Sequence, residues 1–319
     1  MKLSIITINY NNAKGLRKTL ASVAAQTYCD IEHIIIDGGS TDGSVDVIRE
    51  YEKQNSLLLG RDGVGLTIKW LSEPDKGIYN AMNHGIEIAL GRRVVNKNHT
   101  SNITHNTSQE SLCDYVQILN SGDLLAAPDV TERMMNALYT VHHTLYTEKG
   151  FPAILYGNML KSYDGKTIIN RDTCGGDMYT PESFLYFYNG TLNHDCAYIR
   201  CDLFVKYGLY NEQMKICSDW EWYVRAIVLG GEKPVYTNID VTIFDMNGIS
   251  ESRGKNAELI KRERREYLES ILPPAVLHDY DAFSFPILQY QRLKKYHLWG
   301  LVYFIERVLF KFEKWRILH

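Results

Sequence analysis

The chain has 319 residues, enough for two domains or for one large α/β domain with an appendage. Its hydrophobic fraction of 45% and its charged fraction of 23% are those of an ordinary globular protein. Because the net charge is only −3, the composition excludes a global electrostatic attraction to nucleic acid.

Residues 1–90 alternate between apolar strands and amphipathic helices. Short runs rich in β-branched residues predict buried strands at 3–8, 31–36 and 66–71. Apolar residues at helical spacing predict helices around 16–24, at 44–53 and at 78–90. This alternation indicates βαβ units and a mainly parallel sheet. Each strand ends in a polar or Asp-bearing loop, and in open α/β sheets ligands bind at this edge.

Residues 91–111 interrupt the alternating pattern. Asn, Thr, Ser and His dominate this segment, and no apolar period survives in it. We therefore interpret it as an exposed, mobile insertion.

Residues 114–125, DYVQILNSGDLL, contain the first candidate for chemistry. The apolar run at 115–119 predicts a buried strand, and the turn formers at 120–122 end it. Asp123 then stands at the carboxyl end of the strand, where a carboxylate suits a hard divalent cation. Taken alone, this stretch favours a structural role for Asp123, as the cap of a helix that starts near Pro128 or as the end of a turn.

The region from 150 to 274 is predicted to hold further strands and helices. Extended runs indicate strands at 153–156, 167–170, 193–199 and 240–244, with Asp164-Gly165 as a hairpin turn between the first two. Helices are expected at 203–207, at 218–229 with Ser218 as N-cap, and at 251–269. Pro273-Pro274 marks a boundary.

The chain changes character from residue 283 onward. Apolar residues repeat at helical spacing, Lys and Arg cluster on the flanking positions, and Trp299 and Trp315 lie along the stripe. This pattern is typical of a helix that lies in the membrane interface. It also fits a helix that packs on the body of the protein or on a second subunit. The longest apolar run, 298–305, is too short to span a bilayer.

The six cysteines show no CxxC spacing, which argues against a zinc site. The N-terminus opens directly into a strand pattern, without a basic and apolar signal segment. We therefore expect a cytoplasmic protein with free thiols.

Five motifs follow one another in a fixed order: LSIITINYNN, EHIIIDGGSTDGS, SEPDKGIYNAMNHGI, YVQILNSGD and CSDWEW. Together they resemble the family-2 glycosyltransferases with the GT-A fold, and in particular bacterial enzymes that build surface polysaccharides. The resemblance covers roughly residues 2–250. It implies a Rossmann-like α/β fold with a mixed, mainly parallel sheet flanked by helices, and a C-terminal helical extension.

The resemblance also implies a domain organisation. Residues 1–250 would form the catalytic domain, with a nucleotide-sugar-binding half at 1–125 and an acceptor half at 126–250. Residues 251–319 would form the helical extension, which is amphipathic from about residue 283.

Enzymes of this family transfer a sugar from a nucleotide diphosphate sugar to a hydroxyl group. The resemblance implies an inverting reaction that depends on Mn²⁺ or Mg²⁺, a UDP-sugar donor and a glycan or lipid-linked acceptor. Further candidate partners are the inner face of the cytoplasmic membrane, as a peripheral contact, and a second copy of the chain. No nucleic acid is expected.

Each site residue follows from its match to a family motif. The residues matched to nucleotide binding are Thr7, Asn9, Tyr10, Asp37, Asp75 and Lys76. The residues matched to the donor and acceptor region are Asn120, Ser121, His194 and Trp220, with weaker support for the loop at 247–250. Asp123 matches the last acid of the metal-binding DxD motif, whose first acid is replaced here by Ser121 or Asn120.

Asp219 matches the general base of the family. Desolvation beside Trp220 would raise the pKa of Asp219, whereas the start of a helix would lower it. Without the resemblance, Asp219 reads as a helix-capping residue, His194 as a structural histidine and Asp37 as part of an Asx turn.

Two other functions remain open. A nucleotidyltransferase would be expected to carry a Gly-rich, Lys- or Arg-bearing loop after the first strand, and residues 9–12 lack it. A catalytically inactive sugar-binding protein would fit the incomplete DxD motif, but not the presence of Asp219 in its motif.

Overall fold

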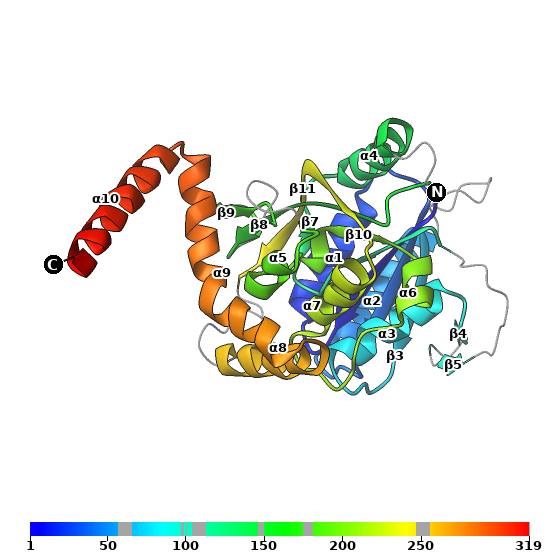
Figure 1. Cartoon of the computed structure of the whole chain (residues 1–319). Helices are drawn as coiled ribbons and strands as arrows, with labels where there is room; N and C mark the ends of the chain where they lie inside the picture. The colour runs from blue at the N-terminus through cyan, green and yellow to red at the C-terminus, as the bar shows by residue number, and fades with distance from the viewer. Residues whose placement is uncertain are drawn as a thin grey trace.

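The computed structural model describes residues 1–56, 66–96, 99, 101–103, 113–145, 150–174, 181–246 and 256–318. A nine-stranded sheet runs through the body of these residues, in the order β3-β2-β1-β6-β10-β8-β11-β7 with β9 beside β8. Helices cover the sheet, and the last helix of the chain projects away from the body (Figure 1). The predicted α/β fold with a helical C-terminal extension is confirmed.

The strands of this sheet are β1 (Leu3–Asn9), β2 (Ile31–Asp37), β3 (Thr67–Ser72), β6 (Tyr115–Ile118), β7 (Leu124–Leu125), β8 (Ile154–Ser162), β9 (Ile168–Asp172), β10 (Ala197–Arg200) and β11 (Pro234–Asp245). The helices are α1 (Ala13–Ala24), α2 (Ser44–Ser56), α3 (Ile78–Ala89), α4 (Val130–Leu145), α5 (Phe184–Asn189), α6 (Asp202–Tyr207), α7 (Ser218–Tyr223), α8 (Ala257–Ile271), α9 (Pro274–Lys295) and α10 (Trp299–Leu318). A 3₁₀ turn, η1 (His194–Cys196), precedes β10, and a π-helical segment, η2 (Val224–Leu229), continues α7.

The parallel strands β3, β2, β1 and β6 form the N-terminal half of the sheet. β1 and β2 are buried along their whole length, which explains why they read as continuous apolar runs rather than as alternating ones. β10 then runs antiparallel to β6 and β8, so the sheet is mixed. Because β1, β2, β3 and β6 all point the same way, the loops that follow them meet at one edge.

The segment at 91–111 contains structure that the sequence did not predict. β4 (Arg93–Val95) and β5 (Ser101–Ile103) pair as a short antiparallel ribbon. The ring of His99 stacks on Trp70 of β3, with 3.6 Å between the ring centroids. The sequence pattern did not predict this ribbon, and residues 104–111 of the proposed insertion lie outside the described part of the chain.

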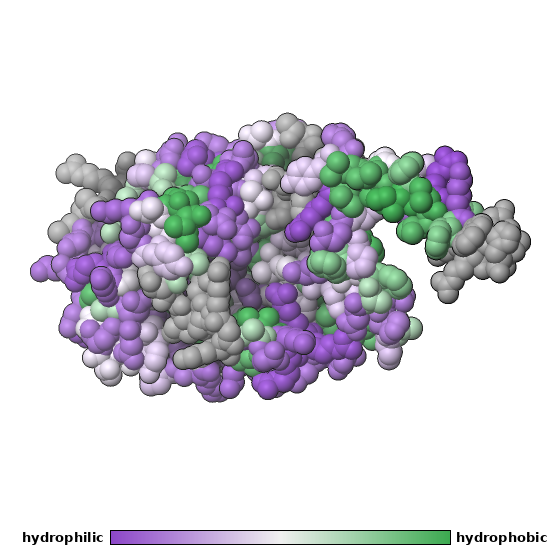
Figure 2. Space-filling model, turned by 90° about the vertical axis from the view of Figure 1, so that its left-hand side faces the viewer, coloured by the Kyte–Doolittle hydropathy of each residue, from purple (hydrophilic) through white to green (hydrophobic). Residues whose placement is uncertain are grey.

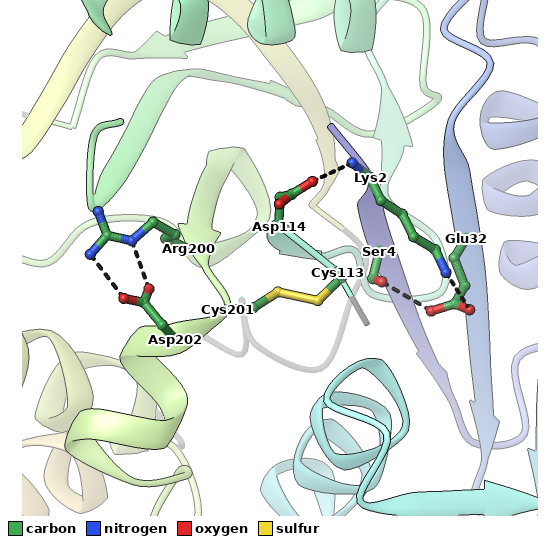
Figure 3. The surroundings of a disulfide bond; sticks show 8 residues. All are labelled: Lys2, Ser4, Glu32, Cys113, Asp114, Arg200, Cys201 and Asp202. Atoms are coloured by element: carbon green, nitrogen blue, oxygen red, sulfur yellow. Dashed lines mark hydrogen bonds and ion pairs between the residues drawn. A yellow bond between two sulfur atoms is a disulfide. The ribbon is translucent and has the colours of Figure 1, made fainter. Parts of the chain in front are cut away.

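A disulfide joins Cys113, just before β6, to Cys201, at the start of α6 (Figure 3). The expectation that all six cysteines are free thiols is therefore wrong. On the same side of the sheet, the carboxylate of Asp114 accepts a hydrogen bond from the N–H of Lys2 at 2.7 Å, and Arg200 pairs with Asp202 at 2.6 Å. The bridge thus ties together the end of the sheet where β1 and β6 begin.

α8 and the first half of α9 pack against the body of the protein. Leu268 of α8 and Leu277 of α9 are buried in the main apolar core. Arg265 of α8 forms an ion pair with Asp281 of α9 at 2.7 Å. The ring of Tyr280 lies edge-on to Phe184 of α5, with 4.6 Å between the ring centroids. These contacts make the first part of the C-terminal extension continuous with the body of the protein.

α10 and the second half of α9 differ from this packed part. α10 projects away from the body (Figure 1). Large apolar side chains are exposed along both segments, among them Phe283, Phe285, Leu301, Phe304 and Phe310. Within the described residues, every helix is too short or too polar to cross a bilayer.

Candidate active site

The carboxyl ends of the parallel strands bring several predicted residues together. In the strand register Asn9 stands opposite Asp37, and Asp37 stands opposite Ser72. Tyr10 follows β1 directly, and Asp75 lies in the loop between β3 and α3. The loops after β1, β2 and β3 therefore form one continuous surface at this edge.

Asp37 holds this edge together. Its carboxylate is fully buried and accepts hydrogen bonds at Oδ1 from the Asn9 amide (2.8 Å) and the Ser40 hydroxyl (2.6 Å). Oδ2 accepts from the Ser40 N–H (2.9 Å) and the Ser72 hydroxyl (2.8 Å). Four hydrogen bonds use the acceptor capacity of a carboxylate. A nucleobase that bonds to Asp37 therefore has to replace one of these donors.

Beside Asp37, a glycine leaves room for an exposed aromatic ring and a carboxylate. Tyr10 is 63% exposed. A Cβ atom built on Gly38 would lie 3.2 Å from Cδ2 of Tyr10 and only 2.5 Å from Oδ2 of Asp75. Both side chains thus lie directly against the backbone of Gly38. Burial raises the pKa of Asp75, and the nearby charge of Asp37 adds to the effect.

The other residues predicted to bind the nucleotide differ in how accessible they are. Thr7 is fully buried, and its hydroxyl lies 2.9 Å from Nε2 of His33 on the neighbouring strand. Its side chain therefore presents no surface to a nucleotide, which corrects the prediction for this residue. Asn9 is also buried and acts through Asp37. The side chain of Lys76 is exposed, and its N–H donates to Asn80 Oδ1 at 3.1 Å.

Asp123 lies at the same edge, in the turn after β6, but it is only 4% exposed. One carboxylate oxygen accepts a hydrogen bond from the N–H of Asp245, at the end of β11, at 2.9 Å. Burial raises the pKa of Asp123 to about 8, and the negative charge of Asp195 adds to the effect. Asp195 is buried too, with its carboxylate accepting a hydrogen bond from the Thr242 hydroxyl at 2.8 Å.

Asp195 and Asp245 were not singled out in the sequence. Their positions in the sequence could have drawn attention to them, because Asp195 directly follows His194 and Asp245 directly follows a predicted strand. What the sequence did not show is that η1 and β11 both approach the turn that carries Asp123. These contacts join segments about 70 to 120 residues apart in the chain, a separation that local patterns do not report.

This acidic cluster fits a divalent cation. The ion pairs of the described residues give neither Asp123 nor Asp195 a lysine or arginine partner. A cation at Asp123 would offset the repulsion between the two buried carboxylates. Within the described residues, no three His, Cys, Asp or Glu side chains form a complete metal site. Phosphate and water oxygens would have to supply the other ligands, as is common for Mg²⁺.

Asp219 lies across from this cluster, at the start of α7. Oδ2 of Asp219 is 3.1 Å from Nδ1 of His194, and Oδ1 is 3.0 Å from the hydroxyl of Tyr79 on α3. Burial alone would raise the pKa of Asp219, but the hydrogen bond and the charge of His194 outweigh it and lower the pKa. The sequence left the direction of this shift open, and the contact with His194, which it did not predict, decides it. Asp219 is ionised at neutral pH.

His194 links Asp219 to the turn that carries Asp123. Burial lowers the pKa of His194, but the hydrogen bond to Asp219 and its charge have a larger effect in the opposite direction. The net result is a pKa of about 8. Nε2 of the protonated ring lies 3.2 Å from the side-chain nitrogen of Asn120, so two donors would face each other. Oδ1 of Asn120 is buried and has no partner among the described residues. Rotating this amide by half a turn brings Oδ1 toward Nε2 and gives the protonated ring an acceptor, and we assign that orientation.

Trp220 does not belong to the substrate surface. Its ring is buried, and its indole N–H donates to the carbonyl of Phe187 at 2.7 Å. The prediction that Trp220 contacts donor or acceptor is therefore wrong, because the residue packs into the core. Ser121 is half-buried, and its carbonyl accepts from the Asn12 amide at 3.0 Å. Residues 247–250 lie outside the described residues.

Comparison with known sequences gives a consistent family. Residues 4–96 match the family described as "Glycosyl transferase family 2". The chain is 29% identical over 258 residues to an uncharacterized glycosyltransferase of Mycobacterium tuberculosis, covering 80% of this chain and 79% of that protein. It is 24% identical over 264 residues to a PGL/p-HBAD biosynthesis glycosyltransferase of Mycobacterium bovis, covering 81% and 82% of the two chains.

Two solved structures share the fold. TarS 1-349 of S. aureus in complex with UDP-GlcNAc has a TM-score of 0.56 at 16% identity, covering 92% of this chain and 73% of that one. The mannosyltransferase PcManGT from Pyrobaculum calidifontis, in complex with GDP-Man and Mn²⁺, has a TM-score of 0.54 at 15% identity, covering 97% and 80%. At these identities the likeness establishes the fold alone.

The ion pair between His194 and Asp219 predicts a pH-dependent stability. The folded state holds the His194 proton with a pKa of about 8, above the ordinary 6.5, so the contribution is fully present below about pH 6.5. It should be lost as the pH rises through 8, at a cost of about 2 kcal/mol. NMR titration of the ring should give the raised pKa in the wild type and a lower one in Asp219→Asn. A wild-type value of 6.5 or below would contradict the pairing.

Proposed function

The chain belongs to glycosyl transferase family 2 and has the GT-A fold, and we propose that it transfers a sugar, with inversion, from a UDP-sugar to a hydroxyl of a glycan or lipid-linked acceptor. The observation that carries this proposal is the chain of contacts Asp219–His194–Asn120, which connects a half-buried, ionised carboxylate to the turn that holds Asp123. These contacts support a reaction centre in which Asp219 would be the base and Asp123 would hold the cation.

The nucleotide would bind along the ends of β1, β2 and β3. The exposed ring of Tyr10 offers a face on which a base can stack, and Asp75 lies beside it across Gly38. The N–H of a uracil ring can donate to a carboxylate, either Asp75 or Asp37 after one of its partners is displaced. The complex of TarS with UDP-GlcNAc, a protein of the same fold, supports a UDP-sugar.

Asp123 would hold the Mn²⁺ or Mg²⁺ ion together with the diphosphate. A bound divalent cation neutralises the charge that builds up on the leaving nucleotide diphosphate. The Mn²⁺ in the PcManGT complex supports a divalent cation in this fold. The role of this chain is to keep Asp123 buried and oriented, through the N–H of Asp245, so that the carboxylate faces the phosphates.

Asp219 would act as the general base. As the acceptor oxygen attacks the anomeric carbon, its proton passes to the Asp219 carboxylate, and the bond between that carbon and the diphosphate oxygen breaks on the opposite face. The protonated ring of His194 and the hydroxyl of Tyr79 hold the carboxylate in one orientation. One sugar is transferred, and the nucleotide diphosphate leaves with the electron pair of the broken bond.

The two alternative functions have less support. The loop after β1 carries neither the glycines nor the basic side chain that a nucleotidyltransferase uses for a triphosphate. A catalytically inactive binding protein has no need for a half-buried carboxylate that is kept ionised by a histidine. Transfer of a sugar accounts for both Asp123 and Asp219.

The C-terminal arm would bring the enzyme to a membrane-bound acceptor. We define the arm as the second half of α9, from Phe283, together with α10. Hydrophobic side chains gather on it where it projects from the body (Figure 2). Exposed Lys294, Arg307 and Lys311 lie among these apolar residues, and basic side chains are attracted to anionic lipid. This arrangement supports a peripheral contact with the inner face of the membrane.

Replacing the base should stop the chemistry without stopping donor binding. Asp219→Asn keeps the shape of the side chain but cannot take up the acceptor proton, so turnover should fall by about 10²-fold or more. Calorimetry should show nearly unchanged binding of the donor, and release of nucleotide in the presence of acceptor measures the turnover. Wild-type turnover in this variant would rule out Asp219 as the base.

Replacing the metal ligand should instead weaken nucleotide binding. Asp123→Ala removes the carboxylate, so calorimetry with UDP should show a loss of the Mn²⁺-dependent part of the affinity. EDTA should abolish wild-type activity, and Mn²⁺ or Mg²⁺ should restore it. Full activity in EDTA would contradict a metal-dependent reaction, and tighter binding of GDP than of UDP would contradict the predicted nucleotide.

Removal of α10 tests the membrane contact. A chain that ends at Tyr296 keeps Leu277, Tyr280 and Asp281, which pack on the body, so it should fold. The full chain should sediment with anionic phosphatidylglycerol vesicles at low salt and dissociate at high salt, whereas the shortened chain should stay in solution. The arm would instead be a subunit interface under two conditions. The full chain would bind neither anionic nor neutral vesicles, and truncation would reduce the size of the oligomer in solution.

A further inference from the structure

The loop before α7 is held by a carboxylate from the C-terminal helices. Glu263 of α8 is only 8% exposed, and it accepts hydrogen bonds from three successive backbone N–H groups. The donors are the N–H groups of Lys215 at 2.7 Å, Ile216 at 3.1 Å and Cys217 at 3.0 Å. Bonds to a charged acceptor are stronger than bonds between neutral groups. Glu263 thus fixes the path of the chain just before Asp219.

The peptide group between Ile216 and Cys217 is held on both sides. Its N–H donates to Glu263, and its carbonyl oxygen, on Ile216, accepts a hydrogen bond from the hydroxyl of Tyr79. The same hydroxyl lies 3.0 Å from Oδ1 of Asp219. A rotation of this peptide group would therefore move the Tyr79 hydroxyl and the Asp219 carboxylate together.

α8 also contacts the chain on the other side of Asp219. The guanidinium carbon of Arg264 lies 4.9 Å from the centre of the Trp220 ring, and the ring of Tyr267 lies edge-on to it at 5.7 Å. The thiol of Cys217 lies 3.8 Å from the carbonyl of Ile260. The residues before and after Asp219 are thus both packed against one helix.

From these contacts we infer that Glu263 is a positioning residue, which orients the Asp219 carboxylate toward the acceptor through the loop at 215–217. This inference rests on the proposed role of Asp219 as the base. The inference places a functional residue in α8. This helix lies outside residues 1–250, to which the sequence analysis assigned the catalytic domain, and outside the family match at 4–96.

Glu263→Gln tests this role, because an amide of the same shape cannot accept all three bonds and would turn its NH₂ group toward one of the donors. We expect kcat to fall about tenfold with little change in KM for the donor, since misplacing a catalytic group by a fraction of an ångström is costly. Glu266→Gln is the matched control. It makes the same change on the same helix, where the side chain is 68% exposed, and it should leave kcat unchanged.

A double variant separates positioning from an independent effect. If Glu263 acts only through Asp219, then Asp219→Asn/Glu263→Gln should be no slower than Asp219→Asn alone. A further tenfold loss in the double variant would overturn the inference. Circular dichroism and thermal unfolding should first show that each variant is folded.

Amide hydrogen exchange gives a readout that does not depend on activity. The N–H groups of residues 215–217 should exchange faster in Glu263→Gln than in Glu266→Gln or the wild type, because they lose their acceptor. Unchanged exchange together with unchanged kcat would refute the role of Glu263. Wild-type turnover in Asp219→Asn would instead refute the proposed base, so the two failures can be told apart.

Discussion

Three carboxylates interact with one imidazole, that of His194: Asp123 and Asp195 are buried, and Asp219 is half-buried. Asp123, Asp195 and Asp219 all raise the pKa of His194, and with all three ionised a single positive ring would have to offset their negative charge. Burial and the repulsion between Asp123 and Asp195 instead raise the pKa of Asp123 to about 8. In a buried site such an excess of like charge is unfavourable unless another cation is present. A nucleotide diphosphate would bring still more negative charge to the same place. The charge balance of the chain itself therefore accounts for a divalent cation more directly than any one motif does.

The parts of the fold that follow from local sequence were predictable. β1, β2 and the strand before Asp123 are short apolar runs that end in turn formers, so their carboxyl ends could be placed at one edge of the sheet. Motif order then identified Asp123 and Asp219 as candidates. Neither the apolar runs nor the motif order could predict the distance between Asp123 and Asp219. That distance depends on how the second half of the chain packs, because this packing brings η1 and α7 to the site.

The wrong predictions share a physical origin. Trp220 and Thr7 were assigned to substrate from their positions in motifs, but the folded chain buries both side chains and satisfies their polar atoms internally. The pairing of Cys113 with Cys201 joins residues 88 positions apart, and no spacing rule predicts it. The contacts of Glu263 were likewise invisible, since a charged residue on a charged helix reads as solvent-exposed until the loop at 215–217 is seen beneath it.

The disulfide and the reaction centre lie at opposite ends of the sheet. Cys113 precedes β6, whereas Asp123 follows it, so opening the bridge leaves the strand-end loops and their hydrogen bonds in place. A bridge of this kind acts mainly by restricting the unfolded chain, with a typical contribution of about 2–4 kcal/mol. Oxidised and reduced preparations would then share one catalytic rate while differing in how long they survive heating or dilution. The oxidation state of the cysteine pair would therefore determine how long the enzyme stays folded, and it would not change the catalytic rate.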